Sequence, residues 1–158
     1  MALSSADQVM AGMAQAAGLY YRLVLLVAPS GSGKTAVMQE VAKRTNTARI
    51  NLNLELSKRL LELTSRQRVL RVRELIEEIM SETGVDAALL DNIELLFDQS
   101  LQQDPLRLLQ GISRNRTVVA AWNGTVEDGQ LTYASPDHHE YRRYAADDAL
   151  IVMLEPAS

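Results

Sequence analysis

The sequence predicts an α/β protein in which a parallel five-stranded sheet carries helices on both faces. Three observations support this fold class. Short apolar runs alternate with stretches of helical periodicity along the chain. One apolar run leads into a glycine-rich turn that opens a helix, and another ends in an aspartate. Since alternating strands and helices form parallel sheets with right-handed crossovers, a ligand is expected at the carboxyl ends of the strands.

Size and composition narrow the classes of protein that remain. The 158 residues suit a single domain, 1–158, that buries its own core. A net charge of −4 gives no support to wholesale nucleic-acid binding, although a local basic face would still permit contact with DNA. The absence of cysteine excludes disulfides and thiolate metal sites, and it fits a reducing, cytoplasmic compartment. The longest apolar run, 23–28, is too short to span a bilayer, so no membrane role is expected.

The first helix is expected over residues 5–17 and the first strand over 23–28. The turn after this strand is typical of a phosphate-binding P-loop, with the residues Pro29, Ser30, Gly31, Ser32, Gly33, Lys34 and Thr35. Its glycines can adopt backbone angles that aim successive N–H groups into one concavity, and the following helix adds the positive end of its dipole. Lys34 supplies a charge for the outer phosphates of ATP, and Thr35 supplies a hydroxyl ligand for Mg²⁺. Ala28 departs from the usual pattern, which has a glycine there.

Two helices are expected after a second strand at 48–52. Asn53 is placed to cap the first of them, and Ser65 is placed to cap the second, which ends at Gly84. Four arginines fall mostly on the polar face of the second helix: Arg66, Arg68, Arg71 and Arg73. They are interpreted either as a solvated surface or as a contact surface for an acidic partner or a nucleic-acid backbone.

The stretch 87–94 is the second informative part of the chain. After a P-loop, a short apolar run that ends in Asp91 is typical of a Walker B strand, whose aspartate supports Mg²⁺ through its water shell. Many ATPases place a catalytic glutamate directly after that aspartate, but Asn92 stands there in this chain. Glu94 lies three positions from Asp91, so one helical turn would bring its carboxylate to the attacking water as a general base. The alternative role for Glu94 is that of a surface helix residue.

The next helix is expected to begin at Asp104, which precedes a proline, and the next strand covers 117–122. Asn123 ends that strand. It is interpreted either as a sensor amide that contacts the γ-phosphate and the attacking water, or as a turn former before Gly124.

The last part of the chain predicts a hairpin, a short helix and a strand. An Asp-Gly pair within 126–131 indicates the hairpin. Asp137 and Glu140 form a capping box for a short helix that would carry Arg142 and Arg143. The final strand is expected over 149–154.

A strand that follows the Walker B strand and ends in a polar residue resembles the arrangement in additional-strand P-loop ATPases. This resemblance implies a three-layer P-loop NTPase fold with the strand order 5-1-4-3-2. No helical lid follows the last predicted strand, so no lid arginine is expected to sense nucleotide. AAA-like ATPases carry an arginine just before the final strand that reaches a neighbour's nucleotide. Arg142 and Arg143 stand at that place, and their alternative role is that of surface arginines.

Five stretches together resemble the BrxF family, the small P-loop proteins of type 3 BREX phage-defence systems: LLVAPSGSGKTAV, INLNLELSKRLLEL, LLDNIELLF, VVAAWNG and DHHEYRRY. The resemblance covers nearly the whole chain. It implies a cytoplasmic bacterial protein that works beside a large ATPase, an adenine methyltransferase and a phosphatase-like protein. It implies no particular reaction for the small protein itself.

Three functions therefore remain open at this point. The first is an Mg²⁺-dependent ATPase in which Glu94 and Asn123 direct water. The second is a nucleotide-dependent switch or assembly module with little activity alone, which Asn92 and the absent lid favour. The third, a small-metabolite kinase, would need an acceptor pocket and an arginine-bearing lid. The partners expected are ATP and either a second copy of the chain or other BREX proteins.

Overall fold

The computed structural model describes residues 4–83, 86–133, 142–145 and 149–154. Its central sheet has five parallel strands in the order β2-β3-β4-β1-β7. The strands are β1 (Leu23–Ala28), β2 (Arg49–Asn51), β3 (Ala87–Asp91), β4 (Thr117–Glu127) and β7 (Leu150–Met153). With β7 as the fifth parallel strand, this is the predicted order 5-1-4-3-2. The predicted α/β fold is confirmed.

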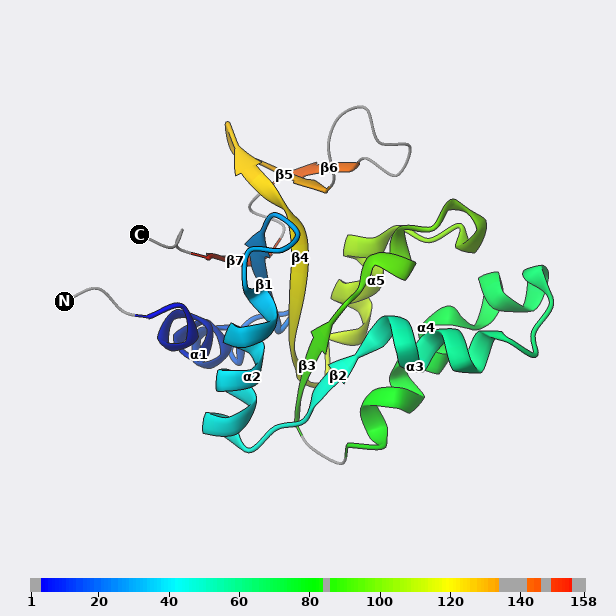
Figure 1. Cartoon of the computed structure of the whole chain (residues 1–158), viewed down its shortest axis with the longest axis horizontal. Helices are drawn as coiled ribbons and strands as arrows, with labels where there is room; N and C mark the ends of the chain where they lie inside the picture. The colour runs from blue at the N-terminus through cyan, green and yellow to red at the C-terminus, as the bar shows by residue number, and fades with distance from the viewer. Residues whose placement is uncertain (1–3, 84–85, 134–141, 146–148, 155–158) are drawn as a thin grey trace.

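Helices cover both faces of this sheet (Figure 1). One layer holds α1 (Ser5–Ala16) and α2 (Lys34–Thr45), and the other holds α3 (Leu52–Leu60), α4 (Ser65–Ser81) and α5 (Pro105–Ile112). Every residue of β1 is buried, because alternate side chains of the strand enter two separate hydrophobic clusters. The apolar run that looked continuous in the sequence is therefore a central strand covered on both sides.

β4 continues beyond the parallel sheet, which corrects the prediction that the strand ends at Asn123. Residues 124–127 pair in antiparallel fashion with β5 (Gln130–Tyr133), and the hairpin projects above the sheet (Figure 1). A Cβ atom on Gly124 would lie 1.7 Å from the Thr132 carbonyl oxygen. Gly124 thus permits a close approach of two strands and does not make a turn. The predicted hairpin turn at Asp128 and Gly129 is confirmed, with φ angles of 52° and 73°.

The predicted short helix is wrong over the residues that the structure describes. Arg142–Ala145 form strand β6, which pairs in antiparallel fashion with β5. Burial alternates along β6, and the Tyr144 ring lies edge-on to Trp122 at a centroid distance of 5.7 Å. Pairing with an open strand edge and this aromatic contact together outweigh a local capping signal. Asp137 and Glu140, which carried the capping signal, lie outside the described residues.

Two helix caps also differ by one or two positions from those predicted. Thr64, and not Ser65, caps α4 through a capping box, and Ser4 caps α1 in the same way. Asn51, and not Asn53, caps α3. Asp104 caps α5 as expected. The shift at α3 matters for the site, because it leaves the Asn53 side chain available for a different partner.

No helix within the described ranges is long and apolar enough to cross a membrane.

Candidate nucleotide-binding site

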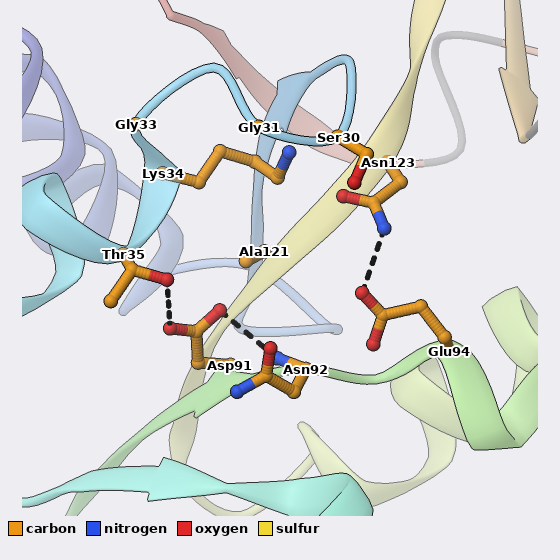
Figure 2. A pocket seen from close by; sticks show the side chains of 10 residues that line it. All are labelled: Ser30, Gly31, Gly33, Lys34, Thr35, Asp91, Asn92, Glu94, Ala121 and Asn123. Carbon is orange, nitrogen blue, oxygen red and sulfur yellow. Dashed lines mark hydrogen bonds between the residues drawn. The ribbon is translucent and has the colours of Figure 1, made fainter.

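The P-loop connects the end of β1 to the start of α2, as the sequence predicted. Gly31 and Gly33 have φ angles of 78° and 96°, a region that side-chain-bearing residues rarely adopt. The Lys34 side chain runs along the inside of the loop (Figure 2). Its ammonium group donates to the carbonyl oxygens of Ala28 and Pro29, each at 2.9 Å. The first residues of the turn thus hold the lysine of the same loop, and Lys34 lines the cavity beside it.

Asp91 lies at the carboxyl end of β3 and faces the start of α2. The Thr35 hydroxyl donates to Asp91 Oδ2 at 2.8 Å, and Arg49 Nη1 reaches the same oxygen at 3.0 Å. The other oxygen, Oδ1, accepts from the Asn92 backbone N–H at 3.0 Å. Asp91 is only 3% exposed, so these contacts replace the water that a carboxylate needs. The two residues predicted to support the metal are therefore in direct contact.

Glu94 begins η1 (Glu94–Phe97), a single turn of 3₁₀ helix directly after β3. Its Oε1 accepts from Asn123 Nδ2 at 2.7 Å, and its Oε2 accepts from Asn53 Nδ2 at 2.9 Å. Figure 2 shows the Glu94 carboxylate beneath the Asn123 amide, on the opposite side of the pocket from Thr35. The chain turns back sharply because Asn92 adopts a left-handed conformation with φ of 55°. Two amides from different elements thus fix the position of this carboxylate.

An aromatic cluster supports the Glu94 turn and the Asn123 strand from behind. Phe97, the last residue of η1, stacks on Tyr133 with ring centroids 3.4 Å apart and lies edge-on to Trp122 at 5.1 Å. The Trp122 indole N–H donates to the Thr132 carbonyl at 3.0 Å. Since Trp122 immediately precedes Asn123, the packing of the β4–β5 hairpin against η1 determines where the two polar side chains meet.

These elements enclose a cavity of about 290 Å³. It is lined by Ser30, Gly31, Gly33, Lys34, Thr35, Asp91, Asn92, Glu94, Ala121 and Asn123. Pro29 and Ser32 belong to the same loop but are not among the lining residues. Arg142 and Arg143 lie elsewhere: Arg142 donates to the Gln103 carbonyl at 3.4 Å, and Arg143 bonds to the Gln130 side chain. Within one chain, the cavity is therefore lined by all the predicted site residues except Pro29, Ser32 and the two arginines.

Charge is concentrated in this pocket. Burial lowers the pKa of Lys34, and the nearby carboxylates of Glu94 and Asp91 partly oppose that shift. A triphosphate would add negative charge beside the lysine and would be met by the N–H groups of the loop. The Thr35 hydroxyl and Asp91 carboxylate are hard oxygen donors of the kind that Mg²⁺ prefers when phosphates and water complete its shell. The residues present fit an Mg²⁺–triphosphate ligand.

Sequence reasoning missed two residues of the site. Arg49 pairs with Asp91, and Asn53 bonds Glu94 while its own Oδ1 accepts from the Leu95 backbone N–H at 2.8 Å. Arg49 is the first residue of β2, and Asn53 lies in α3, two residues after that strand ends. The available signal for Asn53 was its position just after the carboxyl end of a strand, where polar side chains of an α/β sheet meet, whereas Arg49 had no such signal.

A family model for the ATPase family associated with various cellular activities (AAA) matches residues 24–124. The chain belongs to the AAA family. The matched region begins in β1 and ends just after Asn123, so it contains the whole pocket. It thereby confirms the P-loop NTPase prediction at the level of the family.

A solved structure of PCH-2 from C. elegans has a similar fold, with a TM-score of 0.52 and 19% sequence identity. The alignment covers 97% of this chain and 43% of PCH-2, so this AAA-family chain spans less than half the length of that protein. At this identity the likeness concerns the fold alone. A search of curated proteins found no match.

Proposed function

We propose that this AAA-family chain binds ATP with Mg²⁺ in the pocket between the P-loop and Glu94, and that it hydrolyses the nucleotide. One observation carries the proposal. The Glu94 carboxylate, held by the Asn53 and Asn123 amides, lines the same cavity as Lys34 and Thr35. A base that is fixed opposite a phosphate-binding loop is the arrangement that water attack on a terminal phosphate requires.

Each residue has a defined part in this reaction. Lys34 and the loop N–H groups bind the phosphates, while Thr35 and Asp91 hold the magnesium ion, which when bound neutralises phosphate charge. The water oxygen attacks the γ-phosphorus, the bond to the β–γ bridging oxygen breaks, and Glu94 takes the proton of the water. Each Glu94 oxygen has a second lone pair, so this proton can be accepted while both amides stay bound. Asn123 orients the base from the point on β4 where the parallel pairing with β1 ends.

A second candidate function is a nucleotide-dependent switch that hydrolyses ATP slowly by itself. Asn92 favours it, because this residue directly follows Asp91 where many ATPases carry their catalytic glutamate. The Lys34 ammonium also favours it, since it donates to two carbonyl oxygens of the loop and would exchange them for phosphate oxygens when ATP binds. In this case, nucleotide binding alone changes the conformation of the loop, and a partner protein binds one of the two conformations better.

We also propose that fast hydrolysis needs a second copy of the chain. An arginine supplied from outside can be worth about 10³–10⁵ in the rate of phosphoryl transfer. Neither Arg142 nor Arg143 lines the pocket of its own chain, and both lie on β6, which pairs with β5 of the projecting β4–β5 hairpin. From there they can serve the pocket of a neighbour, as the AAA family membership suggests.

Multiple-turnover phosphate release tests these proposals. If a second copy of the chain supplies the arginine, activity per molecule should rise with protein concentration. Mixing the Arg142→Ala/Arg143→Ala variant with Lys34→Ala should restore part of the activity, because one chain supplies the pocket and the other the arginines. Arg107→Ala, a change at an exposed arginine outside the pocket, serves as the control. Concentration-independent activity together with a fully active double variant would overturn the role in trans. ATP binding without phosphate release at any protein concentration would exclude hydrolysis and support the nucleotide-dependent switch.

The cellular role proposed is in a BREX anti-phage system, and its support is the resemblance of the five sequence stretches to the BrxF family. The chain would then act in the cytoplasm beside other BREX proteins. Phage plating on cells that carry the whole system tests this role. The role would be contradicted if cells stayed protected against phage both with the Lys34→Ala variant and after deletion of the gene for this chain.

A further inference from the structure

A second polar cavity, of about 420 Å³, lies away from the nucleotide pocket. Its walls come from α4, from the end of α5 and from the loop that leads into β4. The P-loop, Asp91 and Asn123 all lie where the parallel pairing of their strands ends. The loop that leads into β4 lies where that strand begins, which is the opposite side of the sheet. The two cavities share no lining residue. A ligand here would therefore bind separately from ATP.

Three arginines line this cavity: Arg73, Arg114 and Arg116. One carboxylate, that of Glu77, lines it with them and lies 3.4 Å from Arg73 Nε. Arg73 also donates to the Gly111 carbonyl at 3.0 Å, which fixes its guanidinium group at the cavity wall. The local charge is thus positive in a chain whose net charge is −4. This cavity suits an anion with several acceptor oxygens.

The Arg116 side chain lines the cavity with only part of its guanidinium group. Its Nη1 atom is buried, and among the described residues no hydrogen-bond acceptor faces it. Because water does not reach this atom, a ligand oxygen in the cavity would not reach it either. Arg116 would therefore hold an anion through the part of its side chain that lines the cavity.

Two exposed tyrosines flank the cavity. Tyr20 and Tyr21 lie in the turn between α1 and β1, are 64% and 38% exposed, and meet edge-to-face with ring centroids 4.8 Å apart. Arg114 joins them to the cavity, because it is a lining residue and its guanidinium carbon lies 4.1 Å from the Tyr20 ring centroid. The arginine-lined cavity thus continues into an exposed aromatic surface.

We infer that this surface binds single-stranded nucleic acid. The phosphates would be bound by the three guanidinium groups, and an unpaired base would stack on Tyr20. Guanidinium forks match phosphate oxygens, and an aromatic face accepts any base, which are the two elements of sequence-tolerant single-strand binding. A duplex does not suit the surface, because its bases are already stacked and cannot reach the tyrosines.

Fluorescence anisotropy with a labelled 12-nucleotide oligothymidine tests this inference on the full chain. Tyr20→Ala should weaken binding about 5- to 150-fold, the range measured for loss of one stacked base, whereas Tyr20→Phe should stay close to wild type. Arg114→Ala should make the slope of log affinity against log salt shallower by about 0.7, the value for one phosphate contact on a single strand. Both residues are exposed, so these variants should fold. Arg107→Ala removes the same charge from an 83% exposed side chain outside the cavity and should leave binding nearly unchanged.

Three results would overturn the inference. The first is equal binding by wild type, Tyr20→Ala and Arg114→Ala. The second is a duplex of the same sequence that binds as tightly as the single strand. The third is displacement of the oligonucleotide by inorganic pyrophosphate with no effect of Tyr20→Ala, which would make the cavity a simple anion site. The Lys34→Ala variant should bind the oligonucleotide normally, so the outcome is separate from that of the proposed ATP binding.

Discussion

The nucleotide pocket has two halves that are built in different ways. The phosphate-binding half is one continuous stretch, and the Lys34 ammonium bonds to carbonyl groups only five and six residues away. The half that holds Asp91 and Glu94 is assembled from distant parts of the chain. Asp91 bonds to Thr35 and Arg49 across 56 and 42 residues, and Glu94 to Asn53 and Asn123 across 41 and 29 residues.

The difference indicates which substitutions should affect ligand binding alone and which should affect catalysis and stability. A loop whose contacts are local keeps its shape as long as β1 and α2 are formed, so single substitutions there should affect ligand binding and little else. The carboxylates depend on three neighbouring strands being in register. Substitutions in that half should therefore alter catalysis and stability together.

The largest effect is expected from Glu94→Gln, which removes the base but keeps a side chain of the same size. Loss of general base catalysis should lower turnover by about 10²–10⁴-fold, while ATP affinity should change little. Phosphate release and calorimetric titration measure the two quantities. Equal turnover in this variant and wild type would exclude Glu94 from the reaction.

Lys34→Ala should mainly weaken ATP binding, since it removes the cation from the phosphate-binding half of the pocket. Loss of a charge-assisted contact to phosphate in a partly dry site costs about 2–5 kcal/mol, or roughly 30- to 3,000-fold in ATP affinity. Calorimetric titration gives the affinity, and circular dichroism shows that the variant is folded. Near-normal affinity in a folded variant would contradict the P-loop assignment.

Arg49→Ala should destabilise the half of the pocket that holds Asp91 and Glu94, and it should leave the contacts within the P-loop unchanged. Asp91 is buried and Arg49 is partly exposed, so the nucleotide-free protein should lose about 1–3 kcal/mol of unfolding free energy. Mg²⁺ with ATP should recover part of this loss, because the ion brings positive charge to Asp91. Urea denaturation with and without ligand measures both values.

Arg71→Ala is the matched control for that experiment, because its ion pair with Glu74 lies on the exposed surface of α4. Its cost should be about 1 kcal/mol or less, and ligand should not change it. An Arg49→Ala variant that behaves like this control would mean that Arg49 is a surface residue of no consequence for the site.

Apart from the Arg71→Ala control, Asn53→Ala is expected to have the smallest effect. It removes one of the two amides on Glu94 and the acceptor for the Leu95 N–H group, at a cost of about 1–2 kcal/mol in stability. Turnover should fall less than in Glu94→Gln, because Asn123 still holds the carboxylate. An Asn53→Ala variant as inactive as Glu94→Gln would show that both amides are required to position the base.

The sequence allowed a good part of the fold to be predicted, and the reasons are physical. The strands could be located because buried parallel strands read as short apolar runs between helical patterns, and their order came from the resemblance to additional-strand P-loop ATPases. The P-loop followed because its geometry depends on glycines and a helix start that are adjacent in the chain. The strand β6 was predicted as a helix because a capping box is a local signal, whereas the pairing with β5 is not.

By itself, therefore, the sequence determined the loop that receives phosphate, the strand that ends in Asp91, and the layered α/β architecture. Those features depend on residue types and spacings within one or two elements. The tertiary structure alone decided that Asn53 and Asn123 hold Glu94, that Arg49 neutralises Asp91, and that arginines and tyrosines gather at the far edge of the sheet. Each of those contacts joins residues that become neighbours only after the sheet and its helices have packed.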